Sequence, residues 1–368
     1  MNSSQLRFSD FANFRYGKMP DRTKLGNGSH PVFTGYRIVD TYPEFNADEN
    51  LIIVARGVGG TGDVKISPKK CFVTNLSIIV DLNSDEIDKK FLYYYFVKGL
   101  KQLDSGSAQS QITISDLSNL KVVLPSFDKQ KSIVKILGDL DRKIELNQKI
   151  NETLEQIGQA MFKKYFIEFS QGSEMTMGDV AAIIDCLHSK KPELTKENTG
   201  FIFLQLNNIL DNGLLDLSTK YYISKDDYIR WTSRIEVKEN DFVITNVGRS
   251  GAVAKIPQGV TAAMGRNMTA IRLRDDFNFP GFLSFALNSS WMKEQIESKL
   301  DHGTILSALN VKSIPTLKLP GSKDVVHKYE QDFLTLRKRI EVNHLESSIC
   351  ASLRDSLLPR LMNGQITL

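Results

Sequence analysis

One short pattern occurs twice in this 368-residue chain, each time inside a long stretch with helical spacing. Residues 143–147 read KIELN, and residues 339–343, which lie 196 positions later, read RIEVN. The similarity extends upstream, where LDSGSAQSQITISDLSNLKVVLP (103–125) matches LDHGTILSALNVKSIPTLKLP (300–320), and NLIIVARGVGGTGDVKI (50–66) matches NDFVITNVGRSGAVAKI (240–256). The order of these features is the same in both copies. The chain is therefore a tandem repeat of two similar units.

Each repeat begins with short apolar runs that are typical of strands. Residues 51–55, 77–82, 241–245 and 269–273 are rich in β-branched side chains, and Gly and Pro separate such runs. A short helix is expected after them, over 88–99 in the first repeat and over 279–298 in the second. This mixture predicts an α+β (mixed α/β) globule in each repeat.

A long amphipathic helix is expected at the end of each repeat. Apolar residues follow one another at steps of three and four, which is helical spacing over roughly five heptads. In the first repeat they include Ile133, Leu137, Leu140, Ile144, Ile150, Leu154, Ile157, Met161 and Tyr165, and in the second Phe333, Leu336, Ile340, Ile349, Leu353 and Leu357, with Pro359 and Gly364 closing the helix. At 1.5 Å per residue, a helix of roughly 35 residues is about 50 Å long.

A single helix cannot bury such an apolar seam, so each long helix needs a partner, and the chain supplies one per repeat. We expect the two helices to pair antiparallel, with one globule at each end. The predicted organisation is a globule over 1–126, a helix over 127–170, a globule over 171–322 and a helix over 323–368.

Two asparagines occupy seam positions near the middle of the predicted helices. In an antiparallel pair the midpoints meet, so Asn147 and Asn343 are expected to face each other, to hydrogen-bond and to fix the register of the pair. The alternative is that both side chains turn toward solvent or toward a third helix.

Catalytic motifs are missing from the sequence, although one stretch imitates a cofactor site. Gly57, Gly59 and Gly62 satisfy G-x-G-x-x-G, but a dinucleotide site needs a helix at the third glycine, and Pro68 and β-branched residues follow instead. A Walker A loop, a G-x-S-x-G elbow and the (Asn/Asp)-Pro-Pro-aromatic tetrapeptide of amino-methyltransferases are not present. We therefore expect a protein that is not an enzyme and binds no cofactor of its own.

The cysteines, the histidines and the charge further limit the kinds of protein that this chain can be. The three cysteines form no C-x-x-C pair and the five histidines have no ligand spacing, so no metal site is expected. No run approaches the roughly 18 apolar residues of a membrane span, and the start lacks a leader pattern. Net charge is +4, a mild preference for anionic partners. A cytoplasmic location is expected.

Two similar but non-identical globules at a fixed distance suit a ligand with two different sites at a set spacing, and double-stranded DNA has such half-sites. Polar and basic loop residues of both globules, together with glycines that allow backbone amides to approach phosphates, are the candidate contacts. They are Arg56, Gly59, Gly62, Lys65, Lys69, Lys70, Ser105, Ser107, Gln109, Ser110 and Gln111 in the first repeat, and Arg249, Ser250, Arg266, Asn267, Thr304, Ser307 and Asn310 in the second.

The helical segments resemble a known family. LPSFDKQKSIVKILGDLDRKIELNQKINETLEQIGQAMFKKYF (124–166) is similar to the first conserved helical region of specificity subunits of type I restriction-modification systems, and LRDSLLPRLMNGQI (353–366) is similar to the end of the second. The resemblance implies a non-catalytic DNA reader. It also implies that each target-recognition domain reads one half of a split, asymmetric site while the helices set the spacer. Residues 325–339 match the family less well.

The resemblance further implies partners: two modification subunits that carry S-adenosylmethionine, and restriction subunits that use ATP. Helix residues outside the seam are candidates for binding a modification subunit, although a solvated helix face explains them equally well. They are Lys143, Glu145, Gln148, Glu152, Gln156, Arg339 and Glu341.

Two other functions remain open from the sequence. One is the DNA-reading part of a different multi-subunit modification enzyme, and the other is an elongated scaffold protein that binds no DNA. Phosphate contacts would make binding to duplex DNA strongly dependent on salt, whereas a scaffold would bind duplex weakly at any salt concentration.

Overall fold

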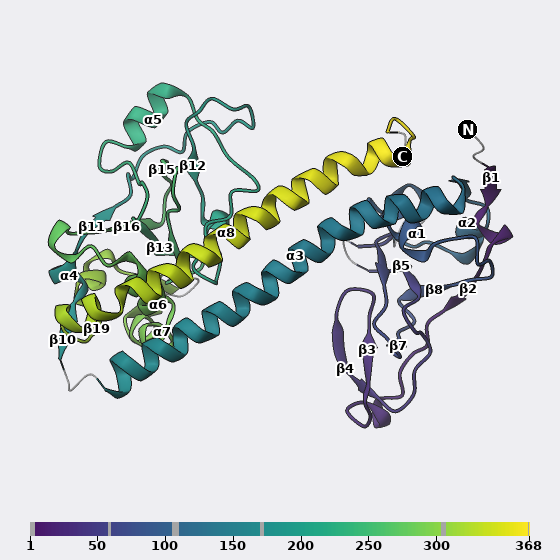
Figure 1. The fold of residues 1–368 in the computed structure, drawn as a ribbon, viewed down its shortest axis with the longest axis horizontal. Coiled ribbons are helices and arrows are strands. Elements are labelled where there is room, and N and C mark those ends of the chain that lie inside the picture. Colours follow the sequence, from purple (N-terminus) through teal and green to yellow (C-terminus); the bar gives the residue numbers. More distant parts are fainter. Residues whose placement is uncertain (1–3, 58–59, 105–109, 170–172, 303–306, 367) are drawn as a thin grey trace. The chain divides into compact units, whose positions relative to one another are not determined.

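The computed structural model describes the chain except residues 1–3, 58–59, 105–109, 170–172, 303–306 and 367. It divides into two compact units: unit 1 comprises residues 1–142 and 350–368, and unit 2 comprises residues 143–349. Two long helices, α3 (Phe127–Phe162) and α8 (Lys323–Met362), contribute residues to both units (Figure 1). Their lengths, 36 and 40 residues, confirm the two long helices predicted from the sequence.

Unit 1 is built around a four-stranded antiparallel sheet of order β2-β8-β5-β6. Its strands are β2 (Ala12–Tyr16), β5 (Leu51–Val54), β6 (Val64–Ile66) and β8 (Ser77–Leu82). A second sheet of order β4-β3-β7 contains β3 (His30–Phe33), β4 (Ile38–Tyr42) and β7 (Phe72–Val73), and β1 (Ser4–Arg7) pairs with β9 (Lys121–Leu124). In addition to its part of α3, unit 1 contains the helices α1 (Lys89–Phe96) and α2 (Ile114–Ser118). It also has 3-10 turns at Phe8–Asp10, Arg22–Lys24 and Lys101–Leu103.

Strand β5 is apolar throughout because both faces of the sheet are covered. Leu51 and Ile53 lie in one core with Phe91 and Leu92 of α1, whereas Ile52 belongs to a second cluster on the other face. Successive side chains of a strand point to opposite faces, so a strand buried on both sides has no alternation of polar and apolar residues.

Unit 2 repeats this plan with the sheet order β11-β16-β13-β14. Its strands are β10 (Glu174–Thr176), β11 (Ala181–Asp185), β12 (Phe203–Leu204), β13 (Phe242–Thr245), β14 (Val253–Lys255), β15 (Ala263–Met264), β16 (Met268–Leu273), β17 (Leu300–His302), β18 (Ser307–Leu309) and β19 (Lys318–Pro320). In addition to its part of α8, unit 2 contains the helices α4 (Met177–Val180), α5 (Lys225–Trp231), α6 (Pro280–Asn288) and α7 (Ser290–Glu297). The 3-10 turns are Leu206–Asn208, Asp275–Phe277 and Val311–Thr316, and a π-helical turn spans Lys163–Glu168.

The two units have matching strand pairings, which confirms the tandem repeat. Strands β3 and β7 pair in parallel in unit 1, as β12 and β15 do in unit 2. The antiparallel pair β1-β9 corresponds to β10-β19, and the isolated bridge Arg56↔Gln111 corresponds to Val247↔Ala308. The central sheet and these flanking pairs are therefore shared by the two α+β units, whereas β4 and the β17-β18 pair have no counterpart among the described residues.

The helix predicted over 279–298 is wrong in one respect, because the structure has two helices there. Ser289 has an extended backbone, and its hydroxyl oxygen accepts a hydrogen bond from the Met292 backbone nitrogen, so it caps α7 and ends α6. Serine at such a position competes with the helix for backbone hydrogen bonds.

Within unit 2, the segments of α3 and α8 run antiparallel. In the π-helical turn that directly follows α3, the ring of Tyr165 stacks on Tyr329 with centroids 4.1 Å apart. The Asn151 amide donates to the Ile340 carbonyl at 3.0 Å, and Lys143 pairs with Glu346 at 2.9 Å. Residue numbers rise along one helix as they fall along the other. The predicted antiparallel pairing is confirmed within this unit.

Within unit 1, the end of α8 packs on the start of α3. Leu358 and Leu361 share a core with Ile133 and Leu137. Asp141 of α3 accepts hydrogen bonds from the Tyr94 hydroxyl at 2.5 Å and from Arg354 of α8 at 2.8 Å. The C-terminal turns of the chain thus complete the core of its first module.

Three residues assigned to the seam from their spacing are not in it. Ile157, Ile349 and Leu353 are 44%, 57% and 46% exposed. The buried line of α3 in unit 2 instead runs through Asn147 and Gly158, and that of α8 through Arg337, Ile340 and Asn343. Polar residues hold several of these seam positions, so spacing alone misplaced these three residues, whereas Phe333 and Ile340 are buried as expected. Pro359, expected to close the helix, lies within its last turns.

No helix in the described part of the chain is long and apolar enough to cross a membrane.

Candidate nucleic-acid interface

In unit 1, part of the predicted DNA-contacting set gathers where strand β5 ends. Arg56 lies two residues beyond β5 and forms a β-bridge with Gln111, whose backbone nitrogen donates to Asp104 at 2.8 Å. The Ser110 hydroxyl donates to the other carboxylate oxygen of Asp104. The Nε atom of Arg56 is shielded from solvent and has no hydrogen-bond partner in the described structure. This edge therefore combines a cationic donor with an amide side chain.

Gly62 has a structural role instead of the predicted phosphate contact. It is buried, with φ +89°, and its backbone nitrogen donates to the Val54 carbonyl at 2.8 Å. An added Cβ would lie 2.8 Å from the backbone carbon of Leu100. Because the amide is already bonded inside the unit, it is not available to a phosphate, and this prediction is wrong.

The three lysines predicted for unit 1 do not join the Arg56 edge. Lys69 and Lys70 are exposed on the turn before β7, beside Asp48 and Glu49, which precede β5. Arg56 follows β5, so the length of that strand separates the two groups. Lys65 is exposed on the edge strand β6. All three are available for contacts with phosphates, at a distance from the Arg56 edge.

In unit 2 the predicted residues also gather at the end of the matching strand, β13. Asn246, which directly follows β13, holds the surrounding loops together: its amide nitrogen donates to the Leu309 carbonyl at 3.1 Å, and its side-chain oxygen accepts from Thr269 at 2.9 Å. Its backbone nitrogen donates to the Asn267 carbonyl at 2.8 Å. Sequence reasoning missed Asn246, although a polar residue ending an apolar strand was a usable signal.

Arg249 and Ser250 are bonded within unit 2. The Arg249 guanidinium donates to the Ile209 carbonyl at 2.7 Å and also pairs with Asp211. The Ser250 hydroxyl lies 2.7 Å from the Ser307 carbonyl oxygen and 2.9 Å from that of Asn246. These two residues were predicted to contact DNA, but their side chains instead form hydrogen bonds that hold the loops of unit 2 together.

The other predicted residues of unit 2 differ in what they offer. Arg266 and Asn267 are exposed, and the side-chain oxygen of Asn310, also exposed, accepts from the Lys312 backbone nitrogen at 3.0 Å. Ser307 is half-buried. Gly59, Ser105, Ser107, Gln109 and Thr304 lie outside the described residues.

The asparagines of the helix pair are buried and bonded, as predicted, but not to each other's side chains. Asn147 is 1% exposed and its amide nitrogen donates to the backbone carbonyl of Asn343 at 3.1 Å. The Asn343 side chain, fully buried, donates to the side-chain oxygen of Asn151 at 2.8 Å. Sequence reasoning did not single out Asn151.

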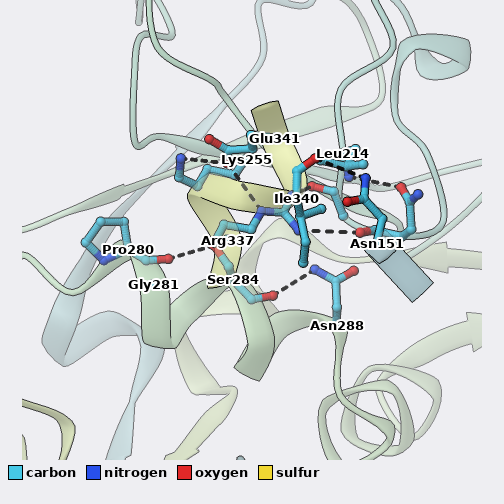
Figure 2. A network of polar contacts seen from close by, with 12 residues as sticks. Asn151, Leu214, Lys255, Pro280, Gly281, Ser284, Asn288, Arg337, Ile340 and Glu341 are labelled. Atoms are coloured by element: carbon cyan, nitrogen blue, oxygen red, sulfur yellow. Dashed lines mark hydrogen bonds and ion pairs between the residues drawn. The ribbon is translucent and has the colours of Figure 1, made fainter. Parts of the chain in front are cut away.

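A buried ionic cluster attaches the sheet of unit 2 to α8 (Figure 2). Lys255 of β14 pairs with Glu341 at 2.8 Å, and Arg337 reaches the same carboxylate at 3.2 Å. Arg337 is 1% exposed and also donates to the Gly213 carbonyl. Glu341 had been proposed for contact with a partner subunit, which is wrong because its carboxylate is committed to these two buried cations.

A second carboxylate joins α8 to α6. The oxygens of Glu330 accept from the backbone nitrogens of Gly281 and Phe282, each at 2.7 Å, at the N-terminus of α6. Burial raises the pKa of Glu330 to about 7, although the two backbone donors act in the opposite direction.

The exposed surface of the helix pair differs from the predicted one. Lys143 is bonded to Glu346 of the other helix. Glu145, Gln148, Glu152, Gln156 and Arg339 are exposed, as a partner surface requires. Sequence reasoning missed a row of apolar side chains on α8, formed by Val342, Leu345 and Ile349, which are 47%, 61% and 57% exposed. Steps of three and four residues place them on one face of the helix, and we call them the apolar row.

One group in the described residues has metal-ligand geometry. Ligand atoms of Asp185, Cys186 and His188 lie within 4.8 Å of one another. The carboxylate of Asp185 is already 2.9 Å from His188 and 3.8 Å from Arg234. Burial raises the pKa of the Cys186 thiol, which disfavours the thiolate that a metal requires. These contacts favour a structural role for the group.

Comparison with known proteins gives consistent matches. Residues 3–156 match the family model described as type I restriction modification DNA specificity domain. The specificity subunit of type I restriction enzyme HindI from Haemophilus influenzae is 23% identical over 375 residues, covering 80% of this chain and 81% of that protein. The MjaIX specificity subunit from Methanocaldococcus jannaschii is 23% identical over 332 residues, covering 81% and 74%.

A solved structure has the same fold over almost the whole chain. The crystal structure of a type I restriction-modification system S subunit from M. genitalium matches with a TM-score of 0.63 at 19% identity, and covers 98% of this chain and 96% of that one. The match therefore extends over both repeats and both long helices.

Proposed function

We propose that this chain is a specificity subunit of a type I restriction-modification system, and that it selects the DNA sequence for such a complex by reading two half-sites, one with each unit. The observation that carries the proposal is the matching topology of two units whose loops carry different residues. Arg56 and Gln111 form the bridge in unit 1, where Val247 and Ala308 form it in unit 2. Equivalent positions with different side chains would read different bases, so the site would be asymmetric.

In this proposal the long helices set the unread spacer between the half-sites. Buried polar groups support a fixed register, because Asn147, Asn151 and Asn343 can bond as they do only in one alignment of α3 and α8. The cluster of Lys255, Arg337 and Glu341 would prevent the sheet of unit 2 from pivoting on α8. A half-site reader that is rigidly attached to a helix of fixed length would tolerate a single spacer length.

In this proposal the chain recognises the DNA sequence, and its partner subunits carry out the catalytic reactions. We propose two modification subunits that bind S-adenosylmethionine, and restriction subunits that use ATP, in the cytoplasm where the DNA is. The apolar row on α8 supports a docked subunit, since exposed apolar side chains on one helix face gain by burial against a partner. Leu146 of α3, 54% exposed, adds to the apolar surface of the helix pair. The exposed polar residues Glu145, Gln148 and Glu152 would form its rim.

Salt-dependent binding of the assembled complex to DNA tests this proposal. The complex of this chain with its modification subunits would be titrated with a duplex carrying its site and with a random duplex, from low to high salt. We expect log K to fall linearly with log salt by roughly 0.9 per phosphate contacted, and the site to be preferred at every salt concentration. Weak binding that barely changes with salt would instead indicate the protein scaffold.

A further inference from the structure

The glycine-rich loop of unit 1 has a use that neither a cofactor site nor a phosphate site explains. Residues 57–62 satisfy G-x-G-x-x-G, yet no helix follows them, because β6 begins at Val64. Gly62 is explained by its contact with Leu100. Gly57 and Gly60 both face the same side chain, that of Tyr36.

Tyr36 lies directly on this loop. A Cβ atom added to Gly57 would be 2.7 Å from the Tyr36 hydroxyl oxygen, and one added to Gly60 would be 2.3 Å from both that oxygen and the ring carbon Cε1. Side chains at these two positions would displace the ring, so the two glycines form a seat that only glycine permits. Sequence reasoning did not single out Tyr36.

The turn that carries Tyr36 is held by its own hydrogen bonds. It joins β3 to β4, and the backbone nitrogen of Thr34 donates to the Arg37 carbonyl at 3.1 Å. Gly35 has φ +88°, and an added Cβ there would be 2.5 Å from the Ser77 hydroxyl oxygen. The tyrosine is therefore presented from a fixed turn onto a fixed seat.

Despite that seat, Tyr36 is 43% exposed, and its neighbours form an accessible surface. Ile38 and Val39 are 56% and 48% exposed. Arg37 is also exposed, and its side chain forms no hydrogen bond or ion pair within the described structure. A tyrosine held on backbone with one side open, next to a free cation, suits contact with a polyanion.

The seat adjoins the Arg56 edge. Arg56 directly precedes Gly57, and its bridge partner is Gln111. The side chain of Tyr36 and the backbones of Arg56 and Gln111 thus come close together from three separate segments of unit 1. Burial, and then the charge of Asp63, raise the pKa of Tyr36, so its hydroxyl is protonated at neutral pH and can donate a hydrogen bond.

Unit 2 has an aliphatic residue over Gly248, which follows Val247 as Gly57 follows the equivalent residue Arg56. The loop after β12 matches the turn after β3, and there the Cδ1 atom of Leu206 lies 3.8 Å from a Cβ added to Gly248. The position over the loop is thus occupied in both units, but by different chemistry. A position that differs between two modules of the same fold is a natural place for different base preferences.

We infer that Tyr36 is a specificity-determining residue, which contacts base edges of the half-site read by unit 1 from its seat on Gly57 and Gly60. The inference rests on the proposed function. Its ring would supply apolar contact and its hydroxyl a hydrogen bond, next to Arg56 and Gln111 in the same half-site. Arg37 would contact phosphate and add affinity without sequence preference.

Methylation of genomic DNA by the complete complex, with each variant in turn, tests this inference. We expect Tyr36→Ala to lower discrimination at one or two base positions of one half-site by about tenfold, with the other half-site and the gap retained. Gly60→Ala should reproduce this change by displacing the ring. Gln111→Ala should affect the same half-site, and Arg7→Ala, a change on the exposed face of β1, should leave the motif as it is.

Unchanged discrimination with Tyr36→Ala would overturn the inference, as would a change in both half-sites together. If that variant does not assemble, Tyr36→Phe and Tyr36→Trp replace it, because both keep an aromatic ring. Unchanged base preference in both of them would equally overturn it. A wild-type complex that yields no bipartite motif would contradict the proposed function itself, an outcome distinct from any of these.

Discussion

The side-chain nitrogen of Asn147 lies 3.1 Å from the backbone carbonyl oxygen of Asn343, the residue at the aligned position of the second repeat. Both side-chain oxygens, those of Asn147 and Asn343, are buried and have no hydrogen-bond partner in the described structure. Two unsatisfied acceptors inside a helix pair lower stability. Buried polar side chains of this kind can fix the register of a helix pair at a cost in stability.

We therefore expect replacement of both asparagines with leucine to raise the thermal stability of the protein and to weaken the specificity of helix register. The Ser347 hydroxyl also donates to the Asn343 carbonyl, at 2.8 Å, so Asn147→Leu alone does not leave that carbonyl without a hydrogen-bond donor. Thermal denaturation monitored by circular dichroism measures the effect. A fall in melting temperature with the double variant would count against this account.

Asn151→Leu serves as the matched comparison for the double variant, and we expect it to lower the thermal stability instead of raising it. The buried amide of Asn343 donates to Asn151, and would lose its partner. An unsatisfied buried donor costs about 1–3 kcal/mol, so this variant should melt at a lower temperature than the wild type.

Removing the charge of Glu341 should be strongly destabilising. Its carboxylate neutralises Lys255 and Arg337, which are 4% and 1% exposed, so Glu341→Gln leaves two buried cations without a counter-ion. Breaking such a cluster costs about 3–5 kcal/mol. Urea denaturation measures it, with Glu145→Gln at the aligned, exposed position as the control, expected to be within about 0.5 kcal/mol of the wild type. Similar losses for both variants would refute the assigned role of Glu341.

The raised pKa of Glu330 predicts a pH-dependent stability. A carboxyl whose pKa is about 7 in the folded state, against an ordinary value of 4.5, favours folding at low pH and loses that contribution as pH rises through 7. The melting temperature of the wild type should therefore fall relative to that of Glu330→Gln between pH 5 and pH 8. Parallel profiles for the two proteins would show that Glu330 is ionised throughout.

Substitution of the apolar row should separate folding from assembly. Because Val342, Leu345 and Ile349 are exposed, changing all three to serine should leave the melting temperature of the isolated chain within a few degrees of the wild type. The same variant should fail to co-purify with the modification subunit. Glu145, Gln148 and Glu152 changed together to serine provide a polar control, expected to retain binding more fully. Full retention by the apolar-row variant would exclude this surface as the docking site.

The sequence predicted the repeat and its elements because their signals are local. The apolar runs that became β5, β8, β13 and β16 are bounded by turn residues, and steps of three and four residues sustained over many turns specify the two long helices. The helical motifs also led to the family whose model matches residues 3–156 and whose specificity subunits are similar to this chain.

Contacts between distant segments were harder to predict. Glu341 has the sequence neighbours of a solvated helix residue, and only the position of Lys255, 86 residues earlier, makes it a buried counter-ion. Ile349 has seam spacing, yet the polar groups of Asn343 and Arg337 turn the other face of α8 inward. Tyr36 was missed for the same reason, since its seat is formed by glycines more than twenty positions away.

Sequencing of modified bases in a cell that carries this chain with its modification subunits tests the central claim most directly. The account predicts methylation at a bipartite, asymmetric motif, with two different half-sites separated by a gap of constant length. Methylation confined to one continuous motif, or half-sites separated by gaps of varying length, would contradict it.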